Sequence, residues 1–169
     1  MTNAIPITIR WMLRQDMPDV LAIENQSFQF PWMEEDFLRC SRQMSCIGLV
    51  AEHDGQIVGF VIYELHKTRL RILNCAVAAG VRRQGVGTQM VTKLAGKLSV
   101  ARRTRVTLEV CETNLIAQVF LRSLGFRAVR IRRDFYEETS EAAYVMQYRL
   151  AAPAVGTALT ESQPSSQQS

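Results

Sequence analysis

A short run of arginines and glycines, Arg82-Arg83-Gln84-Gly85-Val86-Gly87, constrains the fold of this chain more than any other feature. The apolar run 72–77 precedes it, and the segment 88–100, whose apolar residues have helical spacing, follows it. Glycines let the backbone approach a bulky anion, and the start of a helix offers free N–H groups and the positive end of its dipole. A strand, this turn and a helix therefore predict a site for a phosphate-bearing ligand, although an ordinary turn has the same glycine spacing.

Two common nucleotide motifs are absent from this turn. The spacing is not that of a P-loop, because Lys and Ser/Thr are missing at the required places. It is also not the GxGxxG of a dinucleotide-binding fold. The ligand is thus expected to carry phosphate without being bound in either of these two ways.

Length and composition are those of one ordinary globular domain. The chain has 169 residues, of which 47% are hydrophobic and 21% charged. No apolar run reaches the roughly 20 residues that cross a bilayer, and the N-terminal sequence lacks the basic and apolar parts of a signal peptide. We therefore expect a cytoplasmic protein without a membrane partner.

Charge and cysteine content argue against two further classes. The net charge of +4 is mild, and no aromatic residues interleave with the arginines at 102–105, so direct nucleic-acid binding is not expected. The four cysteines form no CxxC pair, and with only two histidines the chain has no Cys/His cluster at metal-ligand spacing. We expect no metal site.

The periodicity along the chain predicts a mixed α/β domain around one sheet over residues 1–150. Asp54-Gly55 supplies the tight turn of a hairpin. Residues 151–169 are rich in Ala, Ser, Thr and Gln and predict a disordered tail. The expected strands are 7–13, 47–52, 56–65, 69–77, 105–110, 126–133 and 143–150, and the expected helices begin near 17, 34, 88 and 115.

Two polar residues stand out in the second half of the chain. Glu109 alternates onto the face opposite Val106, Leu108 and Val110, which suits either a solvent-facing residue or a base in a cleft. Asn114 is expected to cap the helix that follows. That helix is predicted to bury the apolar residues Leu115, Ile116, Val119, Phe120 and Leu124 and to end at Gly125.

Three segments together resemble a known family. They are LNCAVAAGVRRQGVGTQMV, the strand TLEV with the asparagine that opens the next helix, and SLGF. This combination is similar to the GNAT superfamily of acyl-CoA-dependent N-acyltransferases over about residues 7–150. SFQFPW at 27–32 and IRRDFY at 131–136 resemble its RimI type, the ribosomal-protein N-terminal alanine acetyltransferases.

The resemblance implies a single GNAT-like domain, with a mixed sheet of about seven strands and about four helices, that takes acetyl-CoA as its donor. It implies that Glu109 is the base that deprotonates the acceptor amine. The residues implied to bind the donor are Cys75, Ala76 and Val77 on the strand before the turn, Arg83, Gln84, Gly85, Val86, Gly87 and Thr88 in the turn, and Asn114.

The chain departs from the family at the residue expected to protonate the departing thiolate. Family members usually carry a tyrosine five residues before the phenylalanine of the GF motif, and here that residue is Leu121. Tyr136 or Tyr63 could replace it, or the thiolate could leave without an acid, since a simple thiol has a pKa of about 8.5.

Three functions remain open at this point. The first is acetylation of a protein N-terminal α-amine, with a ribosomal protein as the leading target, by direct transfer in a ternary complex. The second is acetylation of a lysine side chain or a small amine. The third is acyl-CoA binding with weak turnover, which the leucine at 121 favours.

Overall fold

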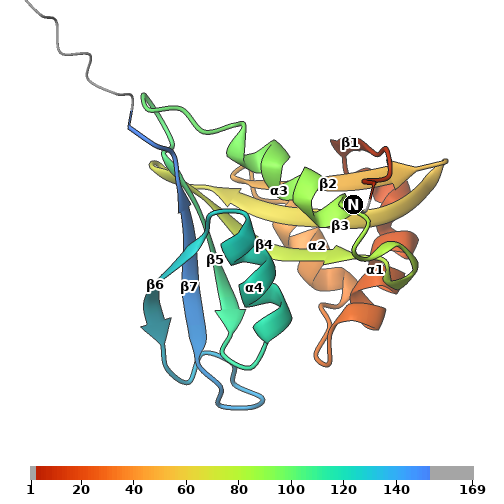
Figure 1. Ribbon diagram of the computed structural model, residues 1–169. Coiled ribbons are helices and arrows are strands. Elements are labelled where there is room, and N and C mark those ends of the chain that lie inside the picture. Colours follow the sequence, from red (N-terminus) through yellow and green to blue (C-terminus); the bar gives the residue numbers. More distant parts are fainter. Residues whose placement is uncertain (1–2, 153–169) are drawn as a thin grey trace, which may run out of the picture.

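One mixed sheet runs through the whole domain (Figure 1). The computed structural model describes residues 3–152. The strands lie in the order β1-β2-β3-β4-β5-β7-β6, and all neighbours are antiparallel except β4 and β5, which are parallel. The strands are β1 (Thr8–Trp11), β2 (Cys46–His53), β3 (Gln56–Leu65), β4 (Arg69–Val77), β5 (Arg105–Cys111), β6 (Arg127–Arg132) and β7 (Ala143–Arg149).

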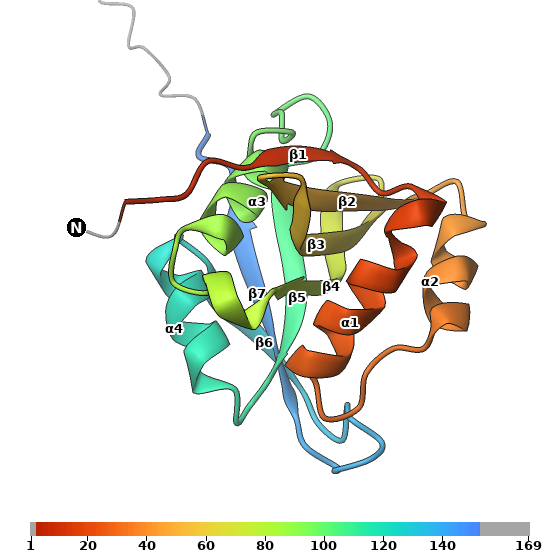
Figure 2. The same ribbon diagram turned by 90° about the vertical axis from the view of Figure 1, so that its right-hand side faces the viewer.

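Helices cover both faces of this sheet (Figure 2). Within residues 3–152 they are α1 (Met17–Ser27), α2 (Glu34–Ser41), α3 (Val86–Ala95) and α4 (Leu115–Ser123), with short 3-10 turns η1 (Arg14–Asp16) and η2 (Ala79–Val81). The predicted α/β domain, with seven strands and four helices, is confirmed. Of the tail predicted at 151–169, everything from residue 153 onward lies outside the described residues.

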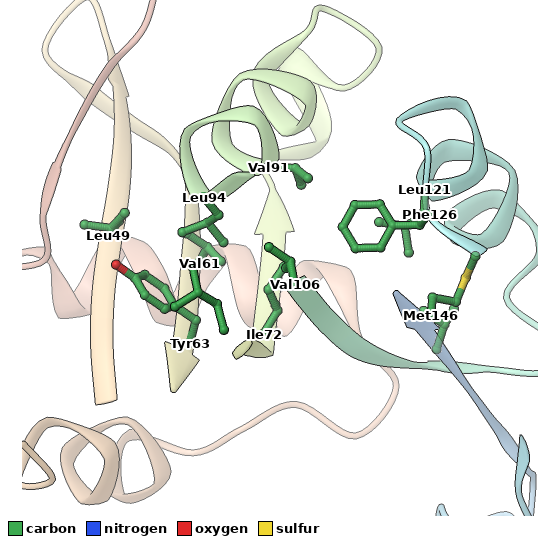
Figure 3. Packing of buried hydrophobic residues seen from close by; sticks show 12 residues of the cluster. Leu49, Val61, Tyr63, Ile72, Val91, Leu94, Val106, Leu121, Phe126 and Met146 are labelled. Carbon is green, nitrogen blue, oxygen red and sulfur yellow. The ribbon is translucent and has the colours of Figure 1, made fainter. Parts of the chain in front are cut away.

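Two apolar layers hold the helices to the sheet. Figure 3 shows the layer under α3 and α4, in which Val91 and Leu94 lie over Ile72 and Val106. On the opposite face, residues of α1 and α2 pack against β2, β3 and β4; the buried members are Met17, Val20, Ile23, Phe37, Val50, Phe60, Ile62 and Ala76. Each fully buried large apolar side chain contributes about 1.5–3 kcal/mol, so both layers fix where the helices lie.

Two local predictions need correction. The helix expected at 88–100 is α3, which begins at Val86 because Gly85 (φ +80°) is its N-cap, and which ends at Ala95. In α4, the predicted burial is wrong for Leu115, Ile116 and Val119, which are 65%, 79% and 69% exposed. This helix is apolar around most of its circumference, and only the side that carries Leu121 meets the core.

An irregularity in β4 marks the place where the sheet opens. The pairing of β3 with β4 shifts between Ile62 and Tyr63, which leaves Leu73 as an extra residue opposite β3. The parallel pairing of β4 with β5 ends one residue earlier, at Ile72 and Leu108. Beyond these residues the two strands no longer pair, and their backbone edges are available to other molecules.

Candidate active site

A cavity of about 370 Å³ lies where β4 and β5 separate. Its walls come from α1, the α1–α2 loop, both strands, α3, α4 and the β6–β7 loop. The lining residues are Glu24, Phe28, Phe30, Trp32, Ile72, Leu73, Asn74, Cys75, Val91, Leu108, Glu109, Val110, Cys111, Asn114, Ala117, Phe120, Leu121 and Tyr136. Four residues predicted from the sequence, Cys75, Glu109, Asn114 and Tyr136, therefore share one cavity.

The turn before α3 has the backbone of an anion-binding site. Arg83 and Gly85 have positive φ angles of 61° and 80°. Within residues 3–152, no hydrogen bond is donated by the backbone N–H groups of residues 83–88. The Gln84 carbonyl instead accepts the Ile5 N–H at 3.0 Å, and the Gln89 side chain donates to the Ile5 carbonyl at 2.9 Å, so the N-terminal segment braces the turn. Six adjacent N–H groups, the last three of them in the first turn of α3, thus have no hydrogen-bond partner among the described residues.

Gly87 lies where α3 comes close to α4. A Cβ at this glycine would be 3.2 Å from the ring of Phe120, which lines the cavity. The absence of a side chain therefore allows the two helices to pack closely beside the turn. Thr88 lines a different groove, beside Ile7, so only its backbone belongs to the turn.

Asn114 caps α4, as its sequence position predicts. Its side-chain oxygen accepts the Ala117 N–H at 3.1 Å. Because Asn114 also lines the cavity, a contact with a bound donor stays a prediction beside the confirmed cap.

Glu109 lies on the face of β5 opposite the core residues Val106 and Val110, as the alternation predicts. Its carboxylate is bridged by two guanidinium groups. Arg71 of β4 approaches one carboxylate oxygen to 3.1 Å, and Arg132 of β6 approaches the same oxygen to 3.2 Å. The Glu109 side chain is only 13% exposed, so it is held in a defined position at the wall of the cavity.

Tyr136 belongs to the loop between β6 and β7 and is half-buried. Burial, with smaller effects from nearby Cys111, Glu109 and Glu141, raises the pKa of its phenol to about 12. Its ring packs edge-on against Phe135 at 4.9 Å. Tyr136 therefore stays protonated at neutral pH and has a proton to donate.

Leu121 and Cys111 also line the cavity. Leu121 is 3% exposed and packs in the core cluster, and its side chain has no proton to donate. The Cys111 sulfur lies 3.2 Å from the Thr113 hydroxyl, and no histidine is among the described residues that line the cavity. A cysteine–histidine nucleophile is therefore not assembled here.

Two polar residues that the sequence analysis did not select belong to this cavity. Glu24 of α1 is 1% exposed and Asn74 of β4 is 8% exposed, and the Asn74 amide donates to the Glu24 carboxylate at 2.9 Å. The signal available in the sequence was the position of Glu24, four residues after Val20 on the helix face that packs into the core.

The family model described as the Acetyltransferase (GNAT) family matches residues 15–126 of the 169. This chain is a GNAT acetyltransferase. Members of the family use acetyl-CoA, and the N–H groups of the turn, which are unpaired within the described residues, suit the diphosphate of such a donor.

Relatives of this acetyltransferase include enzymes that modify protein N-termini. The ribosomal protein bS18-alanine N-acetyltransferase of Escherichia coli K12 is 28% identical over 141 residues, which are 82% of this chain and 95% of that protein. The crystal structure of the Escherichia coli ribosomal-protein-S18-alanine N-acetyltransferase has a TM-score of 0.77 at 25% identity and covers 89% of this chain and 98% of its own. The crystal structure of Ard1 from Thermoplasma volcanium has a TM-score of 0.78 at 26% identity. The match covers 88% of this chain and 100% of the Ard1 chain. The resemblance to the RimI type is thus confirmed.

Residues 3–152 contain no group of three His, Cys, Asp or Glu side chains placed to hold a metal ion. In the same part of the chain, no helix has the length and apolar character needed to span a membrane.

Proposed function

We propose that this acetyltransferase transfers the acetyl group of acetyl-CoA to the α-amine of a protein N-terminus, in a ternary complex. The observation that carries the proposal is the cavity where β4 and β5 separate, because it joins the open edge of β4 to Glu109 and Tyr136. The N-terminal acetyltransferase that is 28% identical over most of both chains supports this class of acceptor. A ribosomal protein is the first target to test.

The proposed donor site extends from the turn to the cavity. The N–H groups of Arg83, Gln84, Gly85, Val86, Gly87 and Thr88 would hold the diphosphate, with Asn114 at the start of α4. The edge of β4 at Cys75, Ala76 and Val77 would pair with the amides of the donor's arm. The bound donor supplies a thioester carbonyl, and a backbone N–H of β4, Val77 being the first candidate, would stabilise negative charge on its oxygen.

Glu109 is the proposed base, acting through water. An α-amine has a pKa of about 7.7–8.0, so a modest base is sufficient near neutral pH. The amine nitrogen forms its bond to the acetyl carbon, the carbon–sulfur bond breaks, and the proton of the amine passes to Glu109. A lysine amine, with a pKa of about 10.4, would demand more of the same carboxylate.

Tyr136 is the proposed acid for the departing thiolate. It shares the cavity with Glu109, and its raised pKa keeps it protonated. This assignment accounts for Leu121 at the place where the family usually has a tyrosine. Leu121 is also the observation that favours the third function, acyl-CoA binding with weak turnover.

One experiment separates these functions. The protein is incubated with acetyl-CoA and a library of peptides with different N-terminal residues, and products are identified by mass. Acetylation of free Ala or Ser termini above N-blocked lysine peptides is expected. Preference for the lysine peptides would replace the proposal with the second function, and binding of acetyl-CoA without coenzyme A release would replace it with the third.

A further inference from the structure

The active-site cavity contains one buried carboxylate that has no part in the transfer described above. Glu24 is 1% exposed, on the face of α1 that also buries Val20 and Ile23. A charged group at such a place is costly unless hydrogen bonds compensate for the lost water. A leucine there would suit the apolar face of α1 better, so the carboxylate needs an explanation.

Both oxygens of Glu24 are used to join segments that are distant in the sequence. One accepts the Trp32 N–H at 2.8 Å, and the other accepts from the Asn74 side chain at 2.9 Å. Burial raises the pKa of Glu24, and the two hydrogen bonds act in the opposite direction by stabilising the charged form. The carboxylate therefore connects α1, the α1–α2 loop and β4.

The α1–α2 loop forms one wall of the cavity through Phe28, Phe30 and Trp32. The Trp32 ring packs edge-on against Phe37 at 5.2 Å, which fixes the ring, while Glu24 fixes the backbone beside it. Phe30 is 51% exposed, so this wall faces incoming molecules.

The other partner of Glu24 lies on β4, the proposed donor strand. Asn74 directly precedes Cys75, whose backbone is proposed to pair with the donor. The spacing between the aromatic wall and the strand is thus set by two hydrogen bonds to one carboxylate. This spacing is the width into which an acceptor amine must fit.

We propose that Glu24 is a positioning residue for the acceptor: its carboxylate holds the aromatic wall of the α1–α2 loop at a fixed distance from Asn74 of the proposed donor strand. This inference rests on the proposed function. Glu24 acts through Trp32 and Asn74 and not on the substrate directly, because it is buried and both of its oxygens already accept hydrogen bonds.

The test is the KM for a peptide acceptor in Glu24→Gln. Glutamine keeps an oxygen for the Trp32 N–H, but it carries no charge, and Asn74 has to turn its amide over to accept from the glutamine NH2 group. The peptide KM is expected to rise about tenfold, because two charge-assisted hydrogen bonds are replaced by neutral ones, which are roughly half as strong. The KM for acetyl-CoA is expected to stay within about twofold of wild type, a split that a general loss of folded protein would not produce.

A second substitution tests the hydrogen bond itself. In the double variant Glu24→Gln with Asn74→Asp, the glutamine NH2 donates to the new carboxylate and its oxygen still accepts from Trp32, so the peptide KM is expected to return to within about threefold of wild type. Glu24→Asp keeps the charge but shortens the reach and is expected to raise the KM as Glu24→Gln does. A double variant no better than Glu24→Gln contradicts the proposal.

Asp16 provides a matched control. It is 4% exposed and accepts a backbone N–H, that of Leu13 at 2.7 Å, and the guanidinium of Arg10, yet it does not line the cavity. Asp16→Asn is expected to lower the melting temperature and leave the peptide KM within about twofold. The proposal is overturned if Glu24→Gln leaves the peptide KM unchanged or if Asp16→Asn raises it equally. A wild-type protein that acetylates no peptide contradicts the proposed function instead.

Discussion

Replacing Glu109 by glutamine tests the proposed base with little change of shape. Glutamine occupies nearly the same volume, but its amide does not accept a proton at neutral pH. If Glu109 receives the proton of the amine, kcat is expected to fall by about 10²–10⁴-fold, the range for loss of a general base. The donor site is not altered, so the Kd for acetyl-CoA is expected to stay within about twofold.

The stability change expected from the structure is much smaller than this loss. Glu109→Gln weakens two ion pairs, to Arg71 and Arg132, whose side chains are 27% and 42% exposed. Part-exposed pairs contribute about 0–1 kcal/mol each, so the variant is expected to lose at most about 2 kcal/mol of unfolding free energy. The protein would then remain folded in the assay, and a large loss of kcat would be chemical.

Glu64→Gln is the matched control for the arginine partner. Glu64 of β3 lies 3.7 Å from Arg71, the arginine that also holds Glu109, but Glu64 does not line the cavity. Coenzyme A release is measured with a thiol reagent, at saturating acetyl-CoA and peptide. The assignment is refuted if Glu109→Gln keeps kcat within about threefold of wild type, or if Glu64→Gln loses as much, since the effect would then belong to Arg71.

Further predictions concern the donor site, the acid and the pH dependence of stability. Gly85→Asp places a side chain on a residue with a φ of +80° and puts its Cβ 2.7 Å from the Cβ of Ala4. Calorimetry is therefore expected to show that coenzyme A binding weakens by at least about 100-fold. Gly80→Asp is the control, because its Cβ would lie in open space, and this variant is expected to bind coenzyme A normally. Tyr136→Phe is expected to lower kcat by about 10²-fold or more, and an unchanged kcat would exclude Tyr136 as the acid. Because the pKa of the Tyr136 phenol is about 12, its ionisation is expected to cause no loss of wild-type kcat below about pH 10. The hydrogen bond from Arg10 lowers the pKa of Asp16 in the folded protein. The stability that ionised Asp16 contributes is therefore present above the unfolded pKa of about 3.9 and is lost as pH falls through the lower folded pKa. The difference in melting temperature between wild type and Asp16→Asn is thus expected to shrink between pH 7 and pH 3. A difference that grows over this range would contradict the sign.

Features encoded by neighbouring residues were predictable from the sequence. The Asp54-Gly55 turn is one, because φ angles of 48° and 76° are what this dipeptide tolerates best. The side of β5 that carries Glu109 is another, because alternation in a strand is a purely local property. The Asn114 cap was predictable for the same reason.

Features decided by distant contacts were not predictable in this way. Leu115, Ile116 and Val119 are as apolar as the residues of α4 that are buried, and only the position of the sheet selects the side with Leu121. The two arginines around Glu109 come from residues 38 positions before it and 23 after it. The periodicity within one element contains no information about which side of α4 is buried or about which arginines contact Glu109.

The extra residue at Leu73 explains how one strand can contribute to both proposed substrate sites. Before it, Leu70 and Ile72 pack in the layer under α3; after it, Asn74 bonds to Glu24 of α1 and Ala76 packs in the layer under α1 and α2. A one-residue insertion reverses which face of the sheet each following side chain points to. The Cys75 side chain therefore packs against the apolar layers on the α3 side of the sheet. Without it, Asn74 would point into the apolar layer under α3, and Glu24 would be a buried charge without its side-chain partner. The alternation of β4 alone, taken as regular, places Asn74 on the wrong face. The same irregularity lies where β4 leaves β5, so the opening of the cavity and the anchoring of its aromatic wall follow from one feature of the backbone.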